Sequence, residues 1–119
     1  EITVECNPDD VTPELMRTYA TAGVNRVSIG VQSMVTHVLS VLGRHHDQSN
    51  VEIAVECARS AGIERINLDL IYGSVGESLD DWSTTVSAAL STSPCGWRCG
   101  DTTWRTSATI RWSRRRFRT

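Results

Sequence analysis

The sequence predicts an α/β fold in which parallel strands alternate with helices, and three observations carry this prediction. Three short segments rich in β-branched residues are each followed by segments with the apolar spacing of helices. The resulting order is β-α-β-α-α-β-α, and strands joined by helical crossovers pair in parallel. The chain has 119 residues, 39% of them hydrophobic and 22% charged, which is enough for one core. We therefore expect a wound α/β sheet or a part of a barrel.

The first strand and helix are predicted from alternation and from capping residues. Residues 2–6 alternate β-branched with polar side chains, and Asn7-Pro8 is typical of the turn that ends such a strand. Thr12 is placed to cap a helix with proline at its first position, and Gly23 is placed to end it. The apolar stripe of that helix is formed by Leu15, Met16 and Tyr19.

The middle of the chain is expected to hold one strand and two helices. Residues 26–31 form the second strand, and a short helix over residues 35–42 ends at Gly43. Residues 49–52 have the pattern of a capping box that opens the next helix, which ends at Gly62. That helix is expected to bury the apolar residues Ile53, Val55 and Ala58.

The third strand and the last helix complete the pattern. Residues 65–71 alternate apolar with polar side chains, and Asp69 lies between Leu68 and Leu70. Ser78 is expected to cap the last helix, whose first turn is acidic and therefore favourable at the positive end of the helix dipole. The buried side of that helix is expected to hold Trp82, Val86 and Leu90.

Charge and composition divide the chain near Leu90. Residues 1–90 hold five arginines against 13 acidic residues, whereas residues 91–119 hold seven arginines against one aspartate. The second segment has no Leu or Val and cannot offer a regular apolar face. We therefore expect a partial α/β domain over residues 1–90 and an irregular tail, rich in Arg, Trp and Ser, over residues 91–119. Because there is no run of about 20 apolar residues and no signal sequence, we expect a cytoplasmic protein without a membrane span.

The tail permits more than one interpretation. Its Arg- and Trp-containing end, residues 111–118, could bind nucleic acid through phosphate neutralisation and stacking. Short basic tails are more often solvated than functional, so nucleic acid is not the expected partner. The same composition is typical of off-frame translation of a GC-rich gene, and we favour a change of reading frame near Leu90.

Polar residues at the carboxyl ends of the predicted strands are the candidate functional residues, because sheets of this type bind ligands at that edge. Glu5 and Asn7 follow the first strand, Gln32 follows the second, and Asp69 lies near the end of the third. Asn7 precedes proline and is interpreted as a turn residue. Asp69 needs a hydrogen-bonded partner or a ligand, because burying a carboxylate among leucines is otherwise costly, and the same argument applies to Glu5.

Three other patterns are interpreted as structural. Residues 44–47 (Arg-His-His-Asp) are expected to form a solvated loop, because adjacent residues point in different directions and no spaced Cys or His completes a metal site. Cys95 and Cys99 lack further ligands, so no cluster or zinc site is expected there. Residues 73–78 form a glycine-rich turn without the lysine or the G-x-G-x-x-G pattern of phosphate-binding loops.

Four separate blocks of the sequence resemble one known family. They are residues 1–8 (EITVECNP), 23–33 (GVNRVSIGVQS), 42–46 (LGRHH) and 66–73 (INLDLIYG). In this order and spacing they resemble the radical SAM family of oxygen-independent coproporphyrinogen III oxidases and HemW-type heme chaperones. The resemblance covers about residues 1–90, and it is specific because four blocks agree.

The resemblance implies a fold, two cofactors and a set of binding residues. The fold is a (βα)6 partial barrel that holds a [4Fe-4S] cluster and S-adenosylmethionine at the carboxyl ends of its strands. The chemistry of the implied binding residues suits S-adenosylmethionine. Carboxylates and an amide can hold its ribose hydroxyls or its amino group, and an arginine can pair with its carboxylate. A porphyrin or heme is the implied ligand of the intact protein. By position, the implied S-adenosylmethionine-binding residues are Glu5, Gln32, Arg44 and Asp69, with Ile71 packing near the adenine.

The chain departs from the family in ways that bear on activity. The cluster motif C-x3-C-x2-C and a Gly-Gly-Thr-Pro block are absent from the sequence, so the cluster ligands are expected outside it. We therefore interpret the chain as an internal fragment that is inactive alone, with no catalytic or metal-ligating residue assigned. The Leu-Gly-Arg-x-His block at residues 42–46 favours the chaperone branch over the oxidase. The alternatives are a non-catalytic α/β fragment whose tail binds nucleic acid or a partner, and an inactive product of a disrupted gene.

Overall fold

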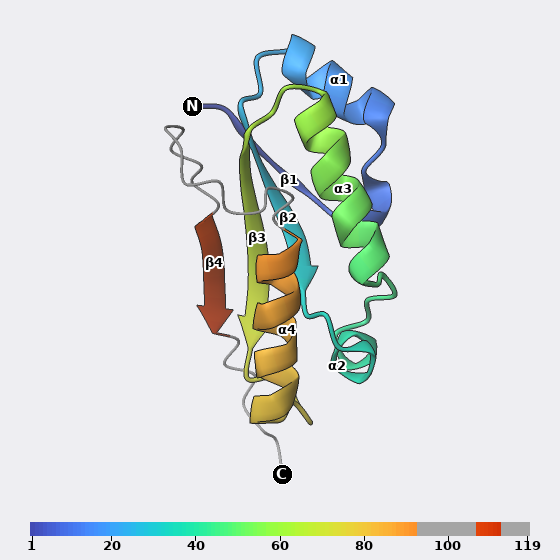
Figure 1. Cartoon of the computed structure of the whole chain (residues 1–119), viewed down its shortest axis with the longest axis vertical. Helices are drawn as coiled ribbons and strands as arrows, with labels where there is room; N and C mark the ends of the chain where they lie inside the picture. Colours follow the sequence, from blue (N-terminus) through green and yellow to red (C-terminus); the bar gives the residue numbers. More distant parts are fainter. Residues whose placement is uncertain (93–106, 113–119) are drawn as a thin grey trace.

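A parallel sheet organises the part of the chain that the structure describes. The computed structural model describes residues 1–92 and 107–112. The strands point in the same direction, so their carboxyl ends meet at one edge of the sheet (Figure 1). The expected α/β fold of parallel strand–helix units is confirmed. In sheet order the described strands are β1 (Thr3–Cys6), β2 (Arg26–Gln32), β3 (Arg65–Tyr72) and β4 (Ser107–Trp112).

Helices cover one face of this sheet. Helices α1 and α3 pack against each other, and α3 also contacts β2. The longest helices have 13 residues, and no helix of the described chain is long and apolar enough to cross a membrane. The cytoplasmic location expected from the sequence stays a prediction. The helices are the one-turn 3-10 helix η1 (Pro8–Asp10) and the α-helices α1 (Pro13–Thr21), α2 (Thr36–Val41), α3 (Gln48–Ser60) and α4 (Leu79–Ser91).

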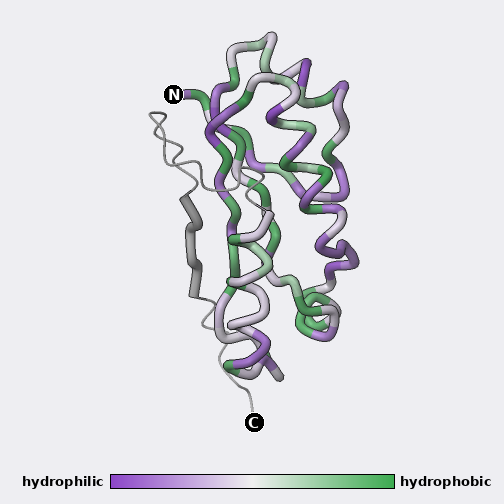
Figure 2. Tube along the Cα trace, in the orientation of Figure 1, coloured by the Kyte–Doolittle hydropathy of each residue, from purple (hydrophilic) through white to green (hydrophobic). Residues whose placement is uncertain are grey.

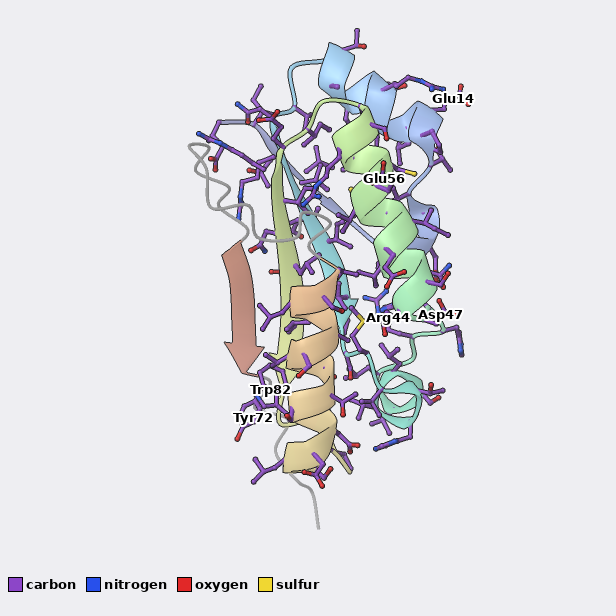
Figure 3. All side chains as sticks on the ribbon, viewed as in Figure 1. Glu14, Arg44, Asp47, Glu56, Tyr72 and Trp82 are labelled. Atoms are coloured by element: carbon purple, nitrogen blue, oxygen red, sulfur yellow. The ribbon has the colours of Figure 1, made fainter. Side chains whose placement is uncertain are left out.

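One core lies between the sheet and these helices. The alternate apolar residues of β2 and β3 are buried there, together with Met16 of α1 and the inner side of α3. Helix α4 contributes Ala89 to the same core, and Trp82 packs against it. The rings of Trp82 and Tyr72 meet edge to face with centroids 5.3 Å apart, which ties the start of α4 to the end of β3 (Figure 3). Hydrophobic and hydrophilic residues alternate along both the strands and the helices of the trace (Figure 2).

Two of the three predicted helix caps are confirmed, and the third lies two residues earlier than expected. Thr12 accepts a hydrogen bond from the backbone N–H of Leu15, and Ser78 forms a capping box with Asp81. Helix α3 is capped by Asp47 instead of Ser49. Asp47 accepts the N–H of Asn50 at 3.0 Å, and the Asn50 side chain accepts the N–H of Asp47 at 2.9 Å. A carboxylate and an amide thus form the box that the pattern had placed at a serine and a glutamate.

Two apolar residues predicted to be buried are exposed. Ile53 is 56% exposed and Leu90 is 63% exposed. On α4 the buried positions are instead Thr85 and Ala89, because the Thr85 hydroxyl bonds to the segment that follows β2. On α3, Val55 and Ala58 are buried as expected, while Val51, Ala54 and Cys57 complete the buried side in place of Ile53.

Part of the tail forms a strand, although the tail was expected to be irregular. Residues 107–112 form β4, which pairs in parallel with β3 from Asn67 opposite Ser107 to Tyr72 opposite Trp112. The segment is rich in β-branched and aromatic residue types, and the edge of β3 offers a row of backbone groups for pairing. Residues 93–106, with Cys95 and Cys99, and residues 113–119 lie outside the described part. The domain boundary near Leu90 and the change of reading frame stay predictions.

Candidate functional site

The sheet face that the core does not use is polar near the carboxyl ends of the strands. Because the alternate apolar residues of β3 point into the core, Asn67 and Asp69 lie on the opposite face. The parallel register sets Glu5 of β1 beside Ser28 of β2, and Ser28 beside Asn67. Four polar side chains from three strands thus share one small area of the sheet.

Three of these side chains, those of Glu5, Ser28 and Asp69, line a cavity of about 510 Å³. Its size falls within the range of small-molecule sites. Glu5 is exposed there, whereas the other four predicted binding residues are half-buried. The predicted convergence at one edge is therefore confirmed, while the role of each residue in binding stays a prediction. The cavity is lined by all five residues singled out from the sequence: Glu5, Gln32, Arg44, Asp69 and Ile71.

Asp69 is held in place by two side chains of the same sheet face. The hydroxyl of Ser28 donates to Asp69 Oδ2 at 2.9 Å, and the amide of Asn67 donates to Asp69 Oδ1 at 2.9 Å. The Asn67 amide also donates to the Ser28 hydroxyl at 3.0 Å. Each carboxylate oxygen keeps a further lone pair for an incoming hydroxyl or amino group. The partner that the carboxylate needs in an apolar strand is therefore provided by Ser28 and Asn67.

Gln32 reaches the cavity through an irregular end of β2. The register between β2 and β3 shifts between Ile29 and Gln32, so β2 carries one residue more than β3 at this point. Gln32 has φ +65°, and Ser33 donates its N–H to the carbonyl of Val31 at 2.8 Å, which closes a γ-turn around Gln32. A non-glycine residue in this conformation costs about 1–3 kcal/mol, and such residues gather at functional sites.

Gly30 leaves room for the Gln32 side chain in this arrangement. A Cβ atom on Gly30 would lie 3.1 Å from Gln32 Nε2 and 3.6 Å from the carbonyl oxygen of Cys6. The first distance is too short for an unhindered contact, so the Gln32 amide packs directly over the glycine backbone. The position of the Gln32 amide in the cavity therefore depends on the absence of a side chain at residue 30.

Arg44 is directed toward the cavity by the end of helix α2. Gly43 has φ +71°, donates to the Ser40 carbonyl at 3.1 Å, and is followed by Arg44, which donates to the Leu39 carbonyl at 2.8 Å. This pair of bonds is a Schellman motif, which requires the left-handed residue that glycine supplies. Figure 3 shows Arg44 and Asp47 in the region between α2 and the start of α3. The glycine stop predicted from the sequence therefore also sets where the backbone of Arg44 leaves the helix.

Cys6 also lines the cavity, with a thiol whose pKa is raised. Burial, and then the negative charge of Asp10, raise the pKa of the Cys6 thiol, so it stays protonated at neutral pH. Within the described residues, no group of three or more His, Cys, Asp or Glu side chains is arranged to hold a metal ion. The described side chains of the cavity therefore offer polar contacts to an organic molecule, and the described residues include no group that could ligate an iron–sulfur cluster.

Sequence reasoning missed four residues that shape the site. Ser28 and Asn67 were not singled out, although the alternation of β3 already places Asn67 on the face of Asp69. Gly30 carried no signal beyond being a glycine inside a strand. The loop of residues 44–47 was expected to be solvated, yet His46 is only 4% exposed and its Nε2 lies 2.6 Å from the carbonyl oxygen of Val31. This contact between segments 15 residues apart has no local signature.

The glycine-rich turn after β3 is closed by its own carboxylate. Gly73 donates its N–H to Glu77 Oε1 at 2.9 Å, and Glu77 donates its N–H to the carbonyl of Ser74 at 3.0 Å. Both Gly73 and Gly76 have positive φ, as the turn requires. A bound phosphate would compete with Glu77 for the same N–H, which agrees with the structural interpretation of this turn.

The fold and the residue pattern of this edge define a class of protein. The sequence profile of the radical SAM superfamily matches residues 1–89. The chain therefore belongs to the radical SAM superfamily. Membership implies S-adenosylmethionine and a [4Fe-4S] cluster as the cofactors of the family.

Among individual proteins, the chain is similar to the heme chaperone HemW of Bacillus subtilis, with 42% identity over 91 residues, 76% of this chain and 24% of the relative. It is equally similar to HemW of Mycobacterium tuberculosis, with 42% identity over 90 residues, 76% of this chain and 23% of the relative. The chain thus spans about a quarter of the length of the curated relatives that it matches.

Solved structures agree with this classification. The coproporphyrinogen III oxidase HemN of Escherichia coli, a radical SAM enzyme, superposes with a TM-score of 0.73 and 26% identity over 79% of this chain and 22% of its own. The methyltransferase TsrM of Kitasatospora setae, solved with cobalamin and a [4Fe-4S] cluster, superposes with a TM-score of 0.69 and 23% identity over 76% of this chain and 18% of its own. The second likeness shows the fold alone.

Proposed function

We propose that residues 1–90 form the S-adenosylmethionine-binding part of a heme-handling radical SAM protein of the HemW type. One observation carries the proposal: five side chains from four segments of the chain meet in a single cavity at the carboxyl edge of the sheet. In parallel α/β folds this edge is where ligands bind. The five side chains are Glu5, Gln32, Arg44, Asp69 and Ile71.

The chemistry of the cavity fits the proposed ligand. S-adenosylmethionine carries a carboxylate, an ammonium group, ribose hydroxyls and a flat apolar base. The guanidinium of Arg44 can pair with the carboxylate, while Asp69 and Glu5 can accept hydrogen bonds from ammonium or hydroxyl groups. The amide of Gln32 can donate and accept, and Ile71 supplies an apolar contact for the base. The complementary charges and the cavity of about 510 Å³ both support this ligand.

The iron–sulfur cluster is not assigned to the described residues. No metal-binding group of His, Cys, Asp or Glu is found among them. In the whole protein, a reduced cluster would supply one electron to the bound S-adenosylmethionine. The residues described here bind and orient that cofactor, Asp69 with a carboxylate held by two side-chain hydrogen bonds and Gln32 from a left-handed backbone.

Heme as the ligand of the whole protein is supported by the relatives. The two HemW chaperones share 42% identity with this chain, and the HemN oxidase shares 26%. The higher identity favours a heme chaperone, and oxidation of coproporphyrinogen III is the second candidate. Both candidates use the same S-adenosylmethionine site, so that site can be tested separately from the heme function.

The binding site is tested by calorimetric titration of the 119-residue chain with S-adenosylmethionine. Asp69→Asn and Arg44→Leu are each expected to weaken binding about tenfold or more, because each removes a charged partner of the ligand. Asp80→Asn and Arg17→Leu change the same residue types at exposed positions and serve as matched controls. Equal affinities for all five proteins would contradict the assignment of the cavity.

The heme function is tested in chimeras, because the chain spans about a quarter of its relatives. The matching segment of Bacillus subtilis HemW is replaced by residues 1–90, and the same segment is placed in the Escherichia coli HemN oxidase. We expect the HemW chimera to keep hemin binding, measured by Soret absorbance, and the HemN chimera to lose coproporphyrinogen III oxidation. The opposite result would favour the oxidase.

A further inference from the structure

A buried histidine contacts the residue that precedes Gln32 in the turn. The Nε2 atom of His46 lies 2.6 Å from the carbonyl oxygen of Val31. A carbonyl only accepts hydrogen bonds, so Nε2 carries the hydrogen and donates it. The same carbonyl accepts the N–H of Ser33 at 2.8 Å, the bond that closes the γ-turn around Gln32. His46 therefore contacts the atom on which the turn depends.

The segment that follows the same turn is held by two buried hydroxyls. Ser33 and Thr85 are both fully buried, and their hydroxyl oxygens lie 3.1 Å apart. Thr85 accepts the N–H of Met34 at 3.2 Å, and Ser33 accepts the N–H of Val35 at 3.1 Å. The segment after β2 is thus tied to α4 on one side and to the loop before α3 on the other. Gln32 between them keeps a left-handed backbone, with φ +65°.

From these contacts we propose that His46 is a positioning residue for Gln32, acting through the Val31 carbonyl to keep the Gln32 amide in the cavity. The proposal rests on the proposed function, in which that amide contacts S-adenosylmethionine. A γ-turn with positive φ is rare and strained, so it persists only where its surroundings hold it. Of the two bonds to the Val31 carbonyl, the one from His46 comes from outside the turn and is the longer-range constraint.

The hydrogen-bond pattern also fixes the tautomer of His46. With the hydrogen on Nε2, the neutral ring has Nδ1 as an acceptor, and Nδ1 is buried without a hydrogen-bond partner among the described residues. The bond to Val31 is therefore the polar contact that orients the ring. This tautomer is measurable in the wild-type protein from the nitrogen chemical shifts of the imidazole.

The experiment compares three variants of the 119-residue chain by titration with S-adenosylmethionine. His46→Leu removes the donor and keeps an apolar side chain, whereas His46→Gln returns an N–H near the position of Nε2. His45→Leu, at the exposed neighbouring histidine, is the matched control. We expect about tenfold weaker binding for His46→Leu, binding within about threefold of wild type for His46→Gln, and no change for His45→Leu.

A second readout does not depend on the ligand. Backbone scalar couplings of Gln32, measured by NMR in the free protein, report the sign of φ. We expect His46→Leu to abolish the positive-φ couplings of Gln32, while His46→Gln and His45→Leu keep them and the amide signals of β1 and β3 stay dispersed in all variants. Unchanged couplings in a folded His46→Leu protein would overturn the proposal.

The outcomes separate this proposal from the proposed function. If wild type does not bind S-adenosylmethionine but His46→Leu still releases the Gln32 turn, the function fails and the positioning role stands. If wild type binds and His46→Leu binds equally well, the positioning role fails and the function stands. If His46→Leu does not fold, the tautomer of His46 in the wild-type protein tests the proposal. A hydrogen on Nε2 agrees with the bond to the Val31 carbonyl, and a hydrogen on Nδ1 instead contradicts it.

Discussion

Ser28 donates its hydroxyl hydrogen to Oδ2 of Asp69 across 2.9 Å, and this bond joins β2 to β3 on the wall of the cavity. Asn67 donates hydrogen bonds to both residues, so each of the three side chains is hydrogen-bonded to the other two. Such a set holds the Asp69 carboxylate in one orientation before any ligand arrives, which reduces the ordering that binding would otherwise require.

Removing the Ser28 hydroxyl is expected to weaken both stability and binding. Ser28→Ala deletes one oriented donor of Asp69, so we expect a loss of about 1 kcal/mol in the free energy of unfolding and about fivefold weaker S-adenosylmethionine binding. Urea unfolding and calorimetric titration measure the two effects. Ser40→Ala, at an exposed serine of α2, is the matched control. An affinity equal to wild type would show that Asp69 is oriented by Asn67 alone.

A methyl group at Gly30 is expected to act through Gln32. The added Cβ would lie 3.1 Å from Gln32 Nε2, so the amide must move and S-adenosylmethionine binding should fall about tenfold. A double-mutant cycle checks the mechanism, because Gly30→Ala should cause little further loss when Gln32 is already alanine. Additive losses in the cycle would mean that the methyl group blocks the ligand itself.

The positive φ of Gln32 predicts a conflict between stability and binding. Gln32→Gly removes the backbone strain, whereas Gln32→Ala keeps it, so the glycine variant should be the more stable of the two by about 1 kcal/mol. Both variants should bind S-adenosylmethionine more weakly than wild type. Urea unfolding measures the difference, and the same pair of substitutions at Ser40, in the last turn of α2, should favour alanine.

The cap of α4 predicts a loss of stability in acid. The backbone N–H of Ser78, followed by the Ser78 hydroxyl and His37, lowers the pKa of Asp81, although partial desolvation acts in the opposite sense. A carboxylate with a lowered folded-state pKa stabilises the protein at neutral pH, and this stabilisation is lost as the pH falls through that pKa.

Urea unfolding at about pH 7 and about pH 3 tests this expectation. Asp81→Asn keeps an oxygen for the Ser78 N–H but removes the charge, so its unfolding free energy should fall less between the two pH values than that of wild type. Asp80→Asn, one residue earlier in the same helical turn, is the matched control. An identical pH dependence in Asp81→Asn and wild type would refute the contribution of this carboxylate.

Much of the fold follows from local patterns in the sequence. The strand ends, the glycine stops and the caps at Thr12 and Ser78 depend on residues within a few positions of one another, and the structure keeps them. Helix α3 is an exception, because its cap is Asp47, two residues before the Ser49 that the pattern predicted. Ile53 and Leu90 are exposed because tertiary packing, not local spacing, decides which side of a helix meets the sheet.

The candidate site was predictable in its residues and less so in its geometry. Asp69 stands out as a carboxylate between leucines, and parallel strands bring their carboxyl ends together by topology alone. The bulge in β2 and the left-handed backbone of Gln32 have no local signal, since glutamine is not a residue type that favours positive φ. The segment around Gln32 is contacted by His46 and Thr85, which lie far away in sequence.

The unequal length of the strands has a consequence for affinity. β1 has four residues, pairs with β2 through four register positions and brings Glu5, while β3 has eight residues and brings Asp69. β1 is the shortest of the described strands. A ligand that contacts both carboxylates binds only those protein molecules in which β1 is paired with β2. Its apparent dissociation constant is then the intrinsic one divided by the docked fraction. Occupancy of the cavity and protection of the β1 amides from hydrogen exchange should therefore rise together.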